Sequence, residues 1–474
     1  MKFAKVACEI FQVTVSTALT FACAAFLSLA VSERPSEAGE VIYKCDGLEE
    51  KSSMTSIAVK MYQGYDGWFF REGDMNSLYE LSPGAISAFK RVNDALAFKG
   101  VHLILMPMLP RGLGGKNFIP DGGVLSDMVY DPNFSATQFR AMISSLRDRG
   151  IDTIDITAIQ DAHPEFDWST FYLKRDIHWT PEGARLVAGA VAEHIRKLRP
   201  EDVNSLEFRT VHTNVKSTIH TLMATALNEI CQDKIPAEHI DLYETKRLVD
   251  SLDALLSDDE ADSRDFVHVV GTSFTDEKMD FNFNGFLRES LKRDVAGFSI
   301  AGGGLTQSVY AWTQNAVGLS KRPEFLIWEY ADLKAILEDN TYINSGVVPA
   351  IIGDCAADLE ITAVEFGNDN KIDIDFPSIT GKAADYYLRF QLSNNALTGF
   401  QLNYKYADGA TKIMTFANPS RVSGLVQLYQ ALPDTGPHNP VHVRLKIDGN
   451  ATSAGSVKLC RYPQGVFQDT ANSN

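Results

Sequence analysis

An almost unbroken apolar run, VHLILMPMLP, occupies residues 101–110 and ends at a proline. A strand is apolar at nearly every position only where both faces of its sheet are buried, as in parallel sheets covered by helices. Helical patterns such as residues 181–198 separate this run from others like it, so the sequence predicts an α/β domain with a mainly parallel sheet. The further candidate strands are residues 266–270, 295–300, 325–328 and, more polar, 151–156.

The chain changes character after about residue 350, where short alternating segments separated by turn residues replace the long apolar runs. Such spacing predicts an all-β sandwich. Residues 340–354 are the expected linker, between an α/β domain at residues 40–345 and a sandwich domain at residues 350–474. The expected strands of the sandwich are residues 359–366, 371–376, 386–392, 400–406, 412–416 and 442–447.

Residues 1–32 have the pattern of an export signal. Lys2 and Lys5 precede a long apolar stretch, and the chain turns polar again at residues 32–35. A cleaved signal peptide is expected, with a retained membrane anchor as the alternative. The rest of the chain is therefore expected outside the reducing cytoplasm.

Four cysteines follow the signal segment, namely Cys45, Cys231, Cys355 and Cys460. Thiols outside the cytoplasm tend to form disulfides, and four cysteines allow three pairings. A Cys355–Cys460 bond would bracket the sandwich, and a Cys45–Cys231 bond would tie the N-terminal segment to the first domain. A zinc site is not predicted, because no closely spaced cysteine pair exists.

The net charge of −17 argues against a generic nucleic-acid-binding protein, because an acidic chain gains little from neutralising phosphates. No nucleic-acid partner is therefore expected.

The segment Asp176-Ile177-His178 precedes the predicted helix at residues 181–198, with Thr180 placed as N-cap and Pro181 at the first helical position. A helix start explains Thr180 and Pro181, but it does not explain Asp176 or His178. A carboxylate two residues before a histidine is suited to orient the imidazole ring.

Ser273 follows the apolar strand at residues 266–270 in the sequence Gly271-Thr272-Ser273. Reactive groups of open α/β sheets lie at the carboxyl ends of strands. A serine hydroxyl becomes nucleophilic only with a base such as His178, whose other ring nitrogen a carboxylate such as Asp176 can hold. A simple turn or helix cap is the alternative explanation of this sequence.

An acyl transfer through Ser273 also needs donors for the oxyanion that forms on the attacked carbonyl. The candidates are the Ser273 amide, the glycine amides at Gly302 and Gly303, and the side chain of Asn284. An ordinary flexible turn explains the glycines equally well.

Three motifs together resemble the SGNH-hydrolase-like polysaccharide O-acetyltransferases: Gly271-Thr272-Ser273, the segment DIHWT at residues 176–180, and GYDGWFF at residues 64–70. The resemblance covers nearly the whole chain after the signal segment and implies a triad of Ser273, His178 and Asp176. Most SGNH proteins have the serine before an Asp-x-x-His element. Here Asp-x-His comes first, so we expect a circularly permuted SGNH-like sheet.

The resemblance further implies a periplasmic acetyltransferase that modifies an exported polysaccharide, with the polyuronate alginate as the expected polymer, without a cofactor or a metal. Upstream acetylation machinery would supply the acetyl donor, and other proteins of an alginate biosynthesis and secretion complex are the expected partners. A carbohydrate esterase with the same triad and a non-catalytic scaffold of the secretion complex are the alternatives.

A polyuronate needs positive and aromatic side chains to bind it, whatever the net charge, because recognition depends on the local field. Two interpretations of the charged residues that alternate along the predicted sandwich strands stay open. They bind the polymer, as in a carbohydrate-binding module, or they form only the solvated face of the sandwich. The candidate substrate-binding residues are Arg288, Tyr330, Tyr404, Lys405, Lys412 and Arg421.

Overall fold

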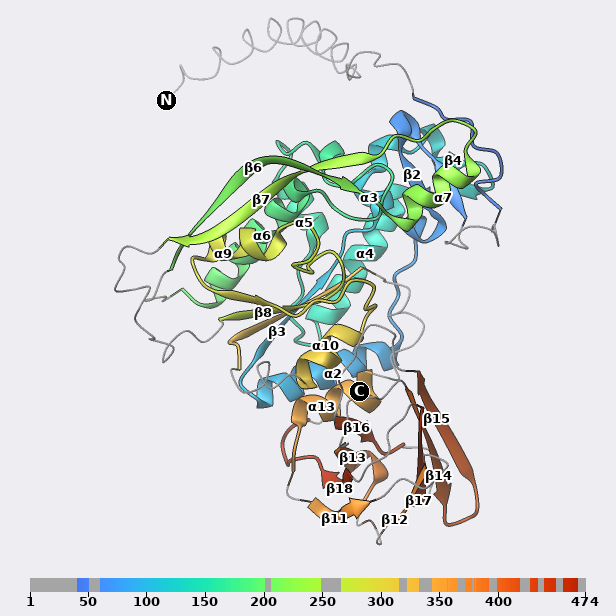
Figure 1. Cartoon of the computed structure of the whole chain (residues 1–474), viewed down its shortest axis with the longest axis vertical. Helices are drawn as coiled ribbons and strands as arrows, with labels where there is room; N and C mark the ends of the chain where they lie inside the picture. The colour runs from blue at the N-terminus through green and yellow to red at the C-terminus, as the bar shows by residue number, and fades with distance from the viewer. Residues whose placement is uncertain are drawn as a thin grey trace, which may run out of the picture. The chain divides into compact units, whose positions relative to one another are not determined.

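The structure is a computed structural model, and its elements are drawn in Figure 1. The expected signal at residues 1–32 and the candidate Arg421 lie outside the residues that it describes. Within the described residues, no helix combines the length and the apolarity needed to cross a bilayer. The described residues are 41–50, 60–200, 206–248, 266–314, 322–331, 343–355, 357–364, 371–376, 379, 381–391, 399–417, 427–433, 439–448 and 455–467.

A four-stranded parallel sheet forms the centre of the α/β region. Its middle strand β10 pairs with β3 on one side and β8 on the other, and every residue of β10 is buried. The apolar runs therefore predict these strands correctly, because a strand buried on both faces carries few polar residues. The order is β3 (His102–Pro107), β10 (Phe325–Tyr330), β8 (Val267–Val270) and β9 (Val295–Gly297).

The strand expected at residues 151–156 is wrong except at one position. Thr153 alone forms a parallel bridge, to Leu105 of β3. Helix α5 (Ile156–Ala162) begins directly afterwards because the Asp155 side chain accepts hydrogen bonds from the Thr157 and Ala158 amides. This N-cap ends the extended backbone.

Helices cover both faces of the sheet (Figure 1), with α2 (Pro83–Phe98) and α10 (Gln307–Gln314) on one side and α6 (Pro181–Leu198) and α9 (Phe283–Leu291) on the other. Helix α6 matches the predicted helix, and the Thr180 hydroxyl accepts a hydrogen bond from the Gly183 amide as its N-cap. The remaining longer helix of this region is α4 (Pro132–Arg147).

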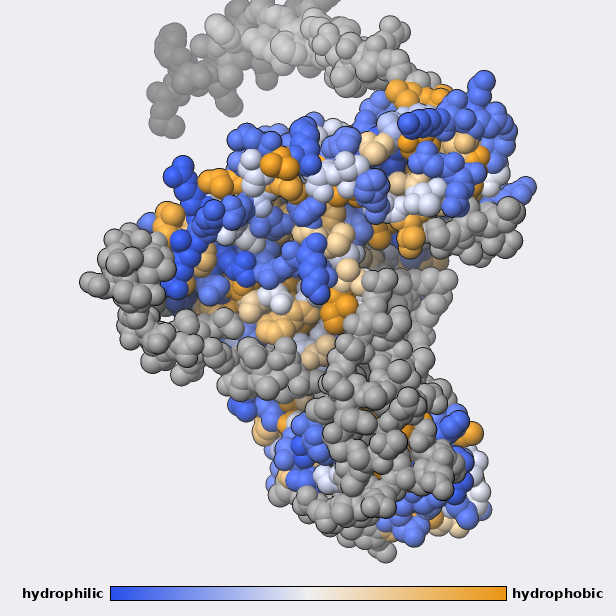
Figure 2. All heavy atoms as spheres, viewed as in Figure 1, coloured by the Kyte–Doolittle hydropathy of each residue, from blue (hydrophilic) through white to orange (hydrophobic). Residues whose placement is uncertain are grey.

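A long antiparallel ribbon of β6 (Glu207–Ile219) and β7 (Glu238–Leu248) was not expected from the sequence. It lies along α6 and α9, and helix α7 (Leu222–Ile230) connects its two strands. Only Ile240 of the ribbon is fully buried, so the hydrophobic alternation that identifies a strand is weak here. In Figure 2 hydrophilic residues cover much of the described surface, with apolar residues between them.

The C-terminal region contains two antiparallel four-stranded sheets that enclose one apolar core, in agreement with the predicted sandwich architecture. Alternate residues of β13 contribute to that core, including Tyr386, Leu388 and Phe390. Strands β16 and β18 were not expected from the sequence. The sheets are β11 (Ala357–Val364), β18 (Gly455–Arg461), β13 (Tyr386–Gln391) and β16 (Gln427–Ala431), and β12 (Lys371–Asp375), β17 (Pro440–Asp448), β14 (Gly399–Tyr406) and β15 (Thr411–Ala417).

The opposite face of β13 and its neighbours is also buried. Tyr387, Tyr429 and Tyr462 belong to the same hydrophobic cluster as Phe89 of α2. The Tyr429 amide donates a hydrogen bond to the Tyr310 hydroxyl of α10 over 3.3 Å. Strands β13 and β16 of the first sheet are thus covered on both faces, whereas strands β14 and β17 of the second sheet have exposed residues on their outer face.

The linker expected at residues 340–354 is wrong for the described residues from 343 on. They form a π-helical turn, η6 (Ile343–Val347), and helix α13 (Val348–Ile352), which belong to the hydrophobic core. The run of apolar residues from 347 to 352 makes burial favourable. Gly353 ends α13 with a φ of 81°, a conformation that favours glycine.

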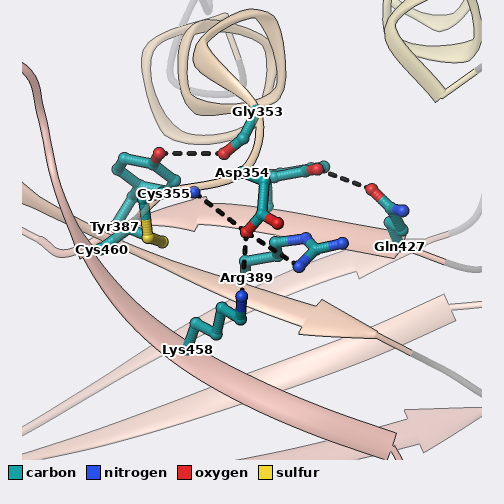
Figure 3. Close-up of a disulfide and its surroundings, with 9 residues drawn as sticks. Gly353, Asp354, Cys355, Tyr387, Arg389, Gln427, Lys458 and Cys460 are labelled. Carbon is teal, nitrogen blue, oxygen red and sulfur yellow. Dashed lines mark hydrogen bonds and ion pairs between the residues drawn. A yellow bond between two sulfur atoms is a disulfide. The ribbon is translucent and has the colours of Figure 1, made fainter. Parts of the chain in front are cut away.

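The two disulfides have the expected pairing, Cys45–Cys231 and Cys355–Cys460. Figure 3 shows the second one beside Asp354, whose carboxylate accepts hydrogen bonds from the Cys355 amide, Arg389 and Lys458. This bond and these ion pairs attach the end of α13 to strands β13 and β18. Cys45–Cys231 instead lies in a small apolar cluster that contains Ile177.

Candidate active site

Ser273 lies just beyond the carboxyl end of β8, where the sequence predicts it. Thr272 starts a turn whose carbonyl accepts hydrogen bonds from the Thr275 and Asp276 amides, over 3.2 and 3.1 Å. The turn lifts Ser273 out of the strand direction and leaves it half-buried. In an open parallel sheet this edge is where ligands bind.

Asp176 and His178 lie on a tight loop before α6. The Leu173 amide donates to the His178 carbonyl over 3.0 Å, and Tyr172 forms a β-bridge with Trp179. The Trp179 indole donates to the Phe274 carbonyl over 3.0 Å, which joins this loop to the serine turn.

The structure brings the three predicted residues into one hydrogen-bonded chain, although 95 positions separate His178 from Ser273. His178 Nε2 lies 2.5 Å from Ser273 Oγ, and His178 Nδ1 lies 2.5 Å from Asp176 Oδ1. The imidazole ring stacks on Phe281, with 5.2 Å between ring centroids. One ring nitrogen therefore faces the hydroxyl while the other is held by the carboxylate, the arrangement that general-base activation of a serine requires.

Asp176 and His178 are 2% and 7% exposed. Burial alone would raise the pKa of Asp176, but the hydrogen bonds and charge of His178, with a contribution from the Thr221 hydroxyl, outweigh it and lower that pKa to about 2. The carboxylate is thus ionised at neutral pH and stabilises a positive charge on the imidazole. Among the described residues, no group of three or more histidine, cysteine or acidic side chains is placed to hold a metal ion.

The chain matches the family described as "SGNH hydrolase-like domain, acetyltransferase AlgX" over residues 61–332, more than half of its 474 residues. The chain belongs to this AlgX family. The matched segment contains all of the parallel sheet and all three residues of the hydrogen-bonded chain.

Individual relatives agree with this membership. The alginate biosynthesis protein AlgX of Pseudomonas aeruginosa is 27% identical over 273 residues, which cover 57% of this chain and 55% of the relative. The probable alginate O-acetylase AlgJ of Azotobacter vinelandii is 28% identical over 281 residues, which cover 57% of this chain and 68% of the relative. The alignment thus spans little more than half the length of the AlgX relative.

The same fold occurs in the solved structure of Pseudomonas aeruginosa AlgX. The TM-score is 0.75 at 20% identity, and the superposition covers 89% of this chain and 100% of that one. The fold is therefore an SGNH-hydrolase-like α/β domain with a β-rich C-terminal region. The circular permutation stays a prediction.

The segment at residues 64–70, one of the three motifs of the AlgX family resemblance, supports the loop that carries Asp176. Trp68, Phe69 and Phe70 are fully buried, and the Phe69 amide donates to the Lys174 carbonyl over 3.0 Å. The buried Arg111 guanidinium donates to the carbonyls of Phe69 and Leu173 over 2.9 and 2.6 Å. The motif thus contributes packing rather than chemistry.

Glu238, at the start of β7, holds the same loop from the other side. Its carboxylate accepts hydrogen bonds from the Lys174 and Arg175 amides over 2.8 and 2.6 Å. Sequence reasoning missed Arg111 and Glu238, because neither stands near a catalytic motif in the chain.

The predicted oxyanion donors differ in their availability. The Gly303 amide already donates to the Ile300 carbonyl over 2.8 Å, and the exposed Gly302 has a φ of 70° in the same turn. Asn284 is 2% exposed, and its amide nitrogen donates to the Thr275 carbonyl over 3.3 Å. The Ser273 amide forms no hydrogen bond within the described part of the chain.

Two predicted substrate-binding residues, Tyr330 and Tyr404, are wrong, because their side chains are buried inside the fold, whereas Arg288 stays a prediction. Tyr330 is 1% exposed and stacks on Phe89, and Tyr404 is fully buried in the sandwich core. Arg288 donates to the Val295 carbonyl and forms an ion pair with Glu277 over 2.6 Å. Both tyrosines thus belong to hydrophobic cores and not to a binding surface.

Lys405 and Lys412 remain accessible. Lys405 is exposed on the outer face of the sheet β12-β17-β14-β15, and Lys412 of β15 is half-buried. In register with Lys405 lies His442 of β17, and Arg444 and Lys446 follow on the same exposed face.

Proposed function

We propose that this chain is a polysaccharide O-acetyltransferase that works through an acetyl-Ser273 intermediate. The observation that carries the proposal is the continuous hydrogen-bonded chain from Asp176 through His178 to Ser273 Oγ at the carboxyl edge of the sheet. Membership of the AlgX acetyltransferase family supports the reaction class.

In the first step, Ser273 Oγ attacks the carbonyl carbon of an acetyl donor and transfers its proton to His178 Nε2. The new carbon–oxygen bond produces a tetrahedral oxyanion, which collapses as the bond to the donor group breaks. The departing group takes the proton from His178, and the acetyl group stays on Ser273. Asp176 stabilises the imidazolium that exists between these events.

In the second step, a sugar hydroxyl loses its proton to His178 Nε2 and attacks the acetyl carbonyl carbon. The bond to Ser273 Oγ then breaks, and the oxygen recovers the proton from His178. The Ser273 amide is the donor best placed for the oxyanion in both steps, because Ser273 Oγ is bonded to the acetyl carbon in both tetrahedral intermediates. Water in place of the sugar would make the same site an esterase.

The acceptor that we propose is alginate, a polyuronate, held by the C-terminal region at residues 350–474. AlgX and AlgJ relatives carry alginate in their names. The exposed basic side chains on the outer face of β12-β17-β14-β15, among them Lys405 and Lys446, suit a carboxylate-bearing polymer.

The proposed location is the periplasm. The signal pattern at residues 1–32 and the two disulfides support export to an oxidising compartment. There the chain would receive acetyl groups from upstream acetylation machinery and work with other proteins of alginate biosynthesis and secretion.

The test is acetyl transfer from a chromogenic acetyl ester to oligomannuronate by the natural chain and by Ser273→Ala, His178→Ala and Asp176→Ala. Each variant should lose activity by about 10³-fold or more, because the three residues act as a unit. Acetylated sugar is the product that mass spectrometry should detect.

Other outcomes are equally informative. Equal activity in all four proteins would refute the triad. Acetate release without any acetylated sugar would indicate an esterase, and a Ser273→Ala protein that still supports polymer export in cells would indicate a scaffold.

A further inference from the structure

Glu329 is a buried carboxylate next to the turn that carries Ser273. It is the residue before last of β10, and its side chain is 0% exposed. Within the described part of the chain it has no ion-pair partner, and burial raises its pKa to about 7 despite the hydrogen bonds that it accepts. Burying a carboxylate without a neighbouring cation costs free energy, so the position of Glu329 needs a structural explanation.

Within the described part of the chain, every hydrogen bond of its carboxylate comes from Thr272 or Thr275, on either side of Ser273. Glu329 Oε2 accepts from the Thr272 amide over 2.6 Å, and the Thr272 hydroxyl donates to the carboxylate over 3.0 Å. The Thr275 hydroxyl lies 3.2 Å from Oε2. The carboxylate therefore holds the turn at both ends of the short segment that contains Ser273.

The backbone at Gly271, directly after β8, approaches this carboxylate so closely that any other side chain at position 271 would force its neighbours to shift. A Cβ atom on Gly271 would lie 2.4 Å from Glu329 Oε2 and 2.7 Å from the Thr275 hydroxyl oxygen. The network also continues outwards, because the Thr275 and Ser299 hydroxyls lie 2.7 Å apart. Glycine in the Gly-Thr-Ser motif is thus explained by Glu329, from a strand that follows 58 positions later.

We propose that Glu329 is a positioning residue for Ser273: it fixes Thr272 and Thr275 so that Ser273 Oγ stays within hydrogen-bond distance of His178 Nε2. This inference rests on the proposed role of Ser273 as the nucleophile. Glu329 itself touches neither the acyl group nor His178. Its effect is to keep the attacking oxygen in one orientation, which raises the fraction of bound donor that can react.

The test compares Glu329→Leu, Glu329→Gln and Glu329→Asp with the natural chain and with Ser273→Ala, by turnover of a chromogenic acetyl ester. Leucine removes every acceptor, so kcat should fall about 100-fold while KM stays within about twofold. Glutamine keeps the length and one carbonyl oxygen for the Thr272 amide, so kcat should recover to within about tenfold of the natural value. Aspartate withdraws the carboxylate by one methylene and should resemble leucine.

The matched control is Ile327→Val, a small change at a fully buried position on the same face of β10. It should lower the thermal midpoint slightly and leave kcat unchanged. Folding of every variant is followed by circular dichroism, and kcat is expressed per folded molecule. If Glu329→Leu does not fold, the contrast between glutamine and aspartate decides the question.

The failures are distinguishable. An inactive Ser273→Ala with normal kcat in Glu329→Leu overturns only the positioning role, as does a glutamine variant as inactive as the leucine or aspartate variant. A fully active Ser273→Ala overturns the proposed function and the positioning role together.

Discussion

At the carboxyl edge of the parallel sheet, Asp176, His178 and Glu329 are each no more than 7% exposed, and the contacts of His178 with Ser273 and of Glu329 with Thr272 join distant segments. On the outer face of the sheet β12-β17-β14-β15, residues such as Arg444 and Lys405 are exposed and alternate with core residues along their strands. The alternation follows from the period of a strand and needs no function. Buried polar groups cost free energy unless they are hydrogen-bonded. The cluster of buried polar residues in the first region is therefore the stronger evidence of a functional site.

The largest difference between the two regions is expected for ester turnover, when Asp176→Asn in the candidate active site is compared with a variant on the outer face of the C-terminal sheet. The asparagine side chain cannot hold the imidazole in the required tautomer or stabilise its charge, so kcat for ester turnover should fall by about 10³- to 10⁴-fold. Asp373→Asn is the control, because Asp373 is an exposed carboxylate of β12 that pairs with Arg444 and His442. The control should keep full turnover, and a comparable loss in both variants would mean that the contrast is wrong.

Removal of the Cys45–Cys231 bond should affect stability and catalysis, whereas removal of Cys355–Cys460 should affect stability alone. Loss of a native disulfide lowers the free energy of unfolding by about 2–5 kcal/mol. Ile177, between Asp176 and His178, packs against the cluster that contains Cys45 and Cys231. Paired serine variants, compared by urea unfolding and by ester turnover, test this difference, and equal turnover in both pairs would contradict it.

The pH dependence of stability should identify Glu329. Its pKa rises from an ordinary 4.5 to about 7 on folding, so the folded chain holds the proton more tightly than the unfolded chain. Its contribution to stability is complete below pH 4.5 and is lost as the pH rises through about 7. The loss amounts to about 3 kcal/mol.

Glu329→Gln does not titrate, so its unfolding free energy should decline less over this interval. Urea unfolding at several pH values measures the difference, with Ile327→Val as the control that retains the natural slope. Parallel curves for the natural chain and Glu329→Gln would show that the carboxylate does not titrate there.

The smallest effect is expected on the outer face of the C-terminal sheet. Reversing Lys405 and Lys446 to glutamate should weaken oligomannuronate binding about tenfold at low salt, since each exposed charge contributes about 1 kcal/mol or less. Turnover of the small ester should not change. Lys216→Glu on the β6–β7 ribbon is the control, because Lys216 is an exposed lysine far from this sheet in the chain. Unchanged affinity in the double variant would leave that face as an ordinary solvated surface.

Point substitutions are preferable to a truncation here. The sequence suggests a cut after residue 340, but α13 lies in the hydrophobic core, and Tyr387, Tyr429 and Tyr462 share a cluster with Phe89. Deleting them would expose that cluster and unfold more than the β-rich region.

Strong local patterns made much of this architecture predictable. The runs that became β3, β8 and β10 are apolar because both of their faces are covered, and Thr180-Pro181 begins α6 through a local hydrogen bond. The Asp-x-His spacing and the serine after a strand were also visible. Their approach, over 95 positions, depends on tertiary packing that no local pattern encodes.

Each miss has its own physical cause. Tyr330 and Tyr404 were predicted to bind the polymer from their places at the end of a strand and beside basic residues, yet both rings are buried and fill core volume. Glu329 was missed because a single acidic residue near the end of the run FLIWEY is typical of a solvated strand end. The β6–β7 ribbon lacks a buried face that would mark its strands.

Each disulfide joins two cysteines that are neighbours in the order Cys45, Cys231, Cys355, Cys460. If the chain enters an oxidising compartment with its N-terminus first, Cys231 arrives when Cys45 is the sole unpaired thiol of this set, and Cys460 arrives when Cys355 is. Oxidation in order of arrival therefore produces the native bonds, with no need for an isomerase to exchange them.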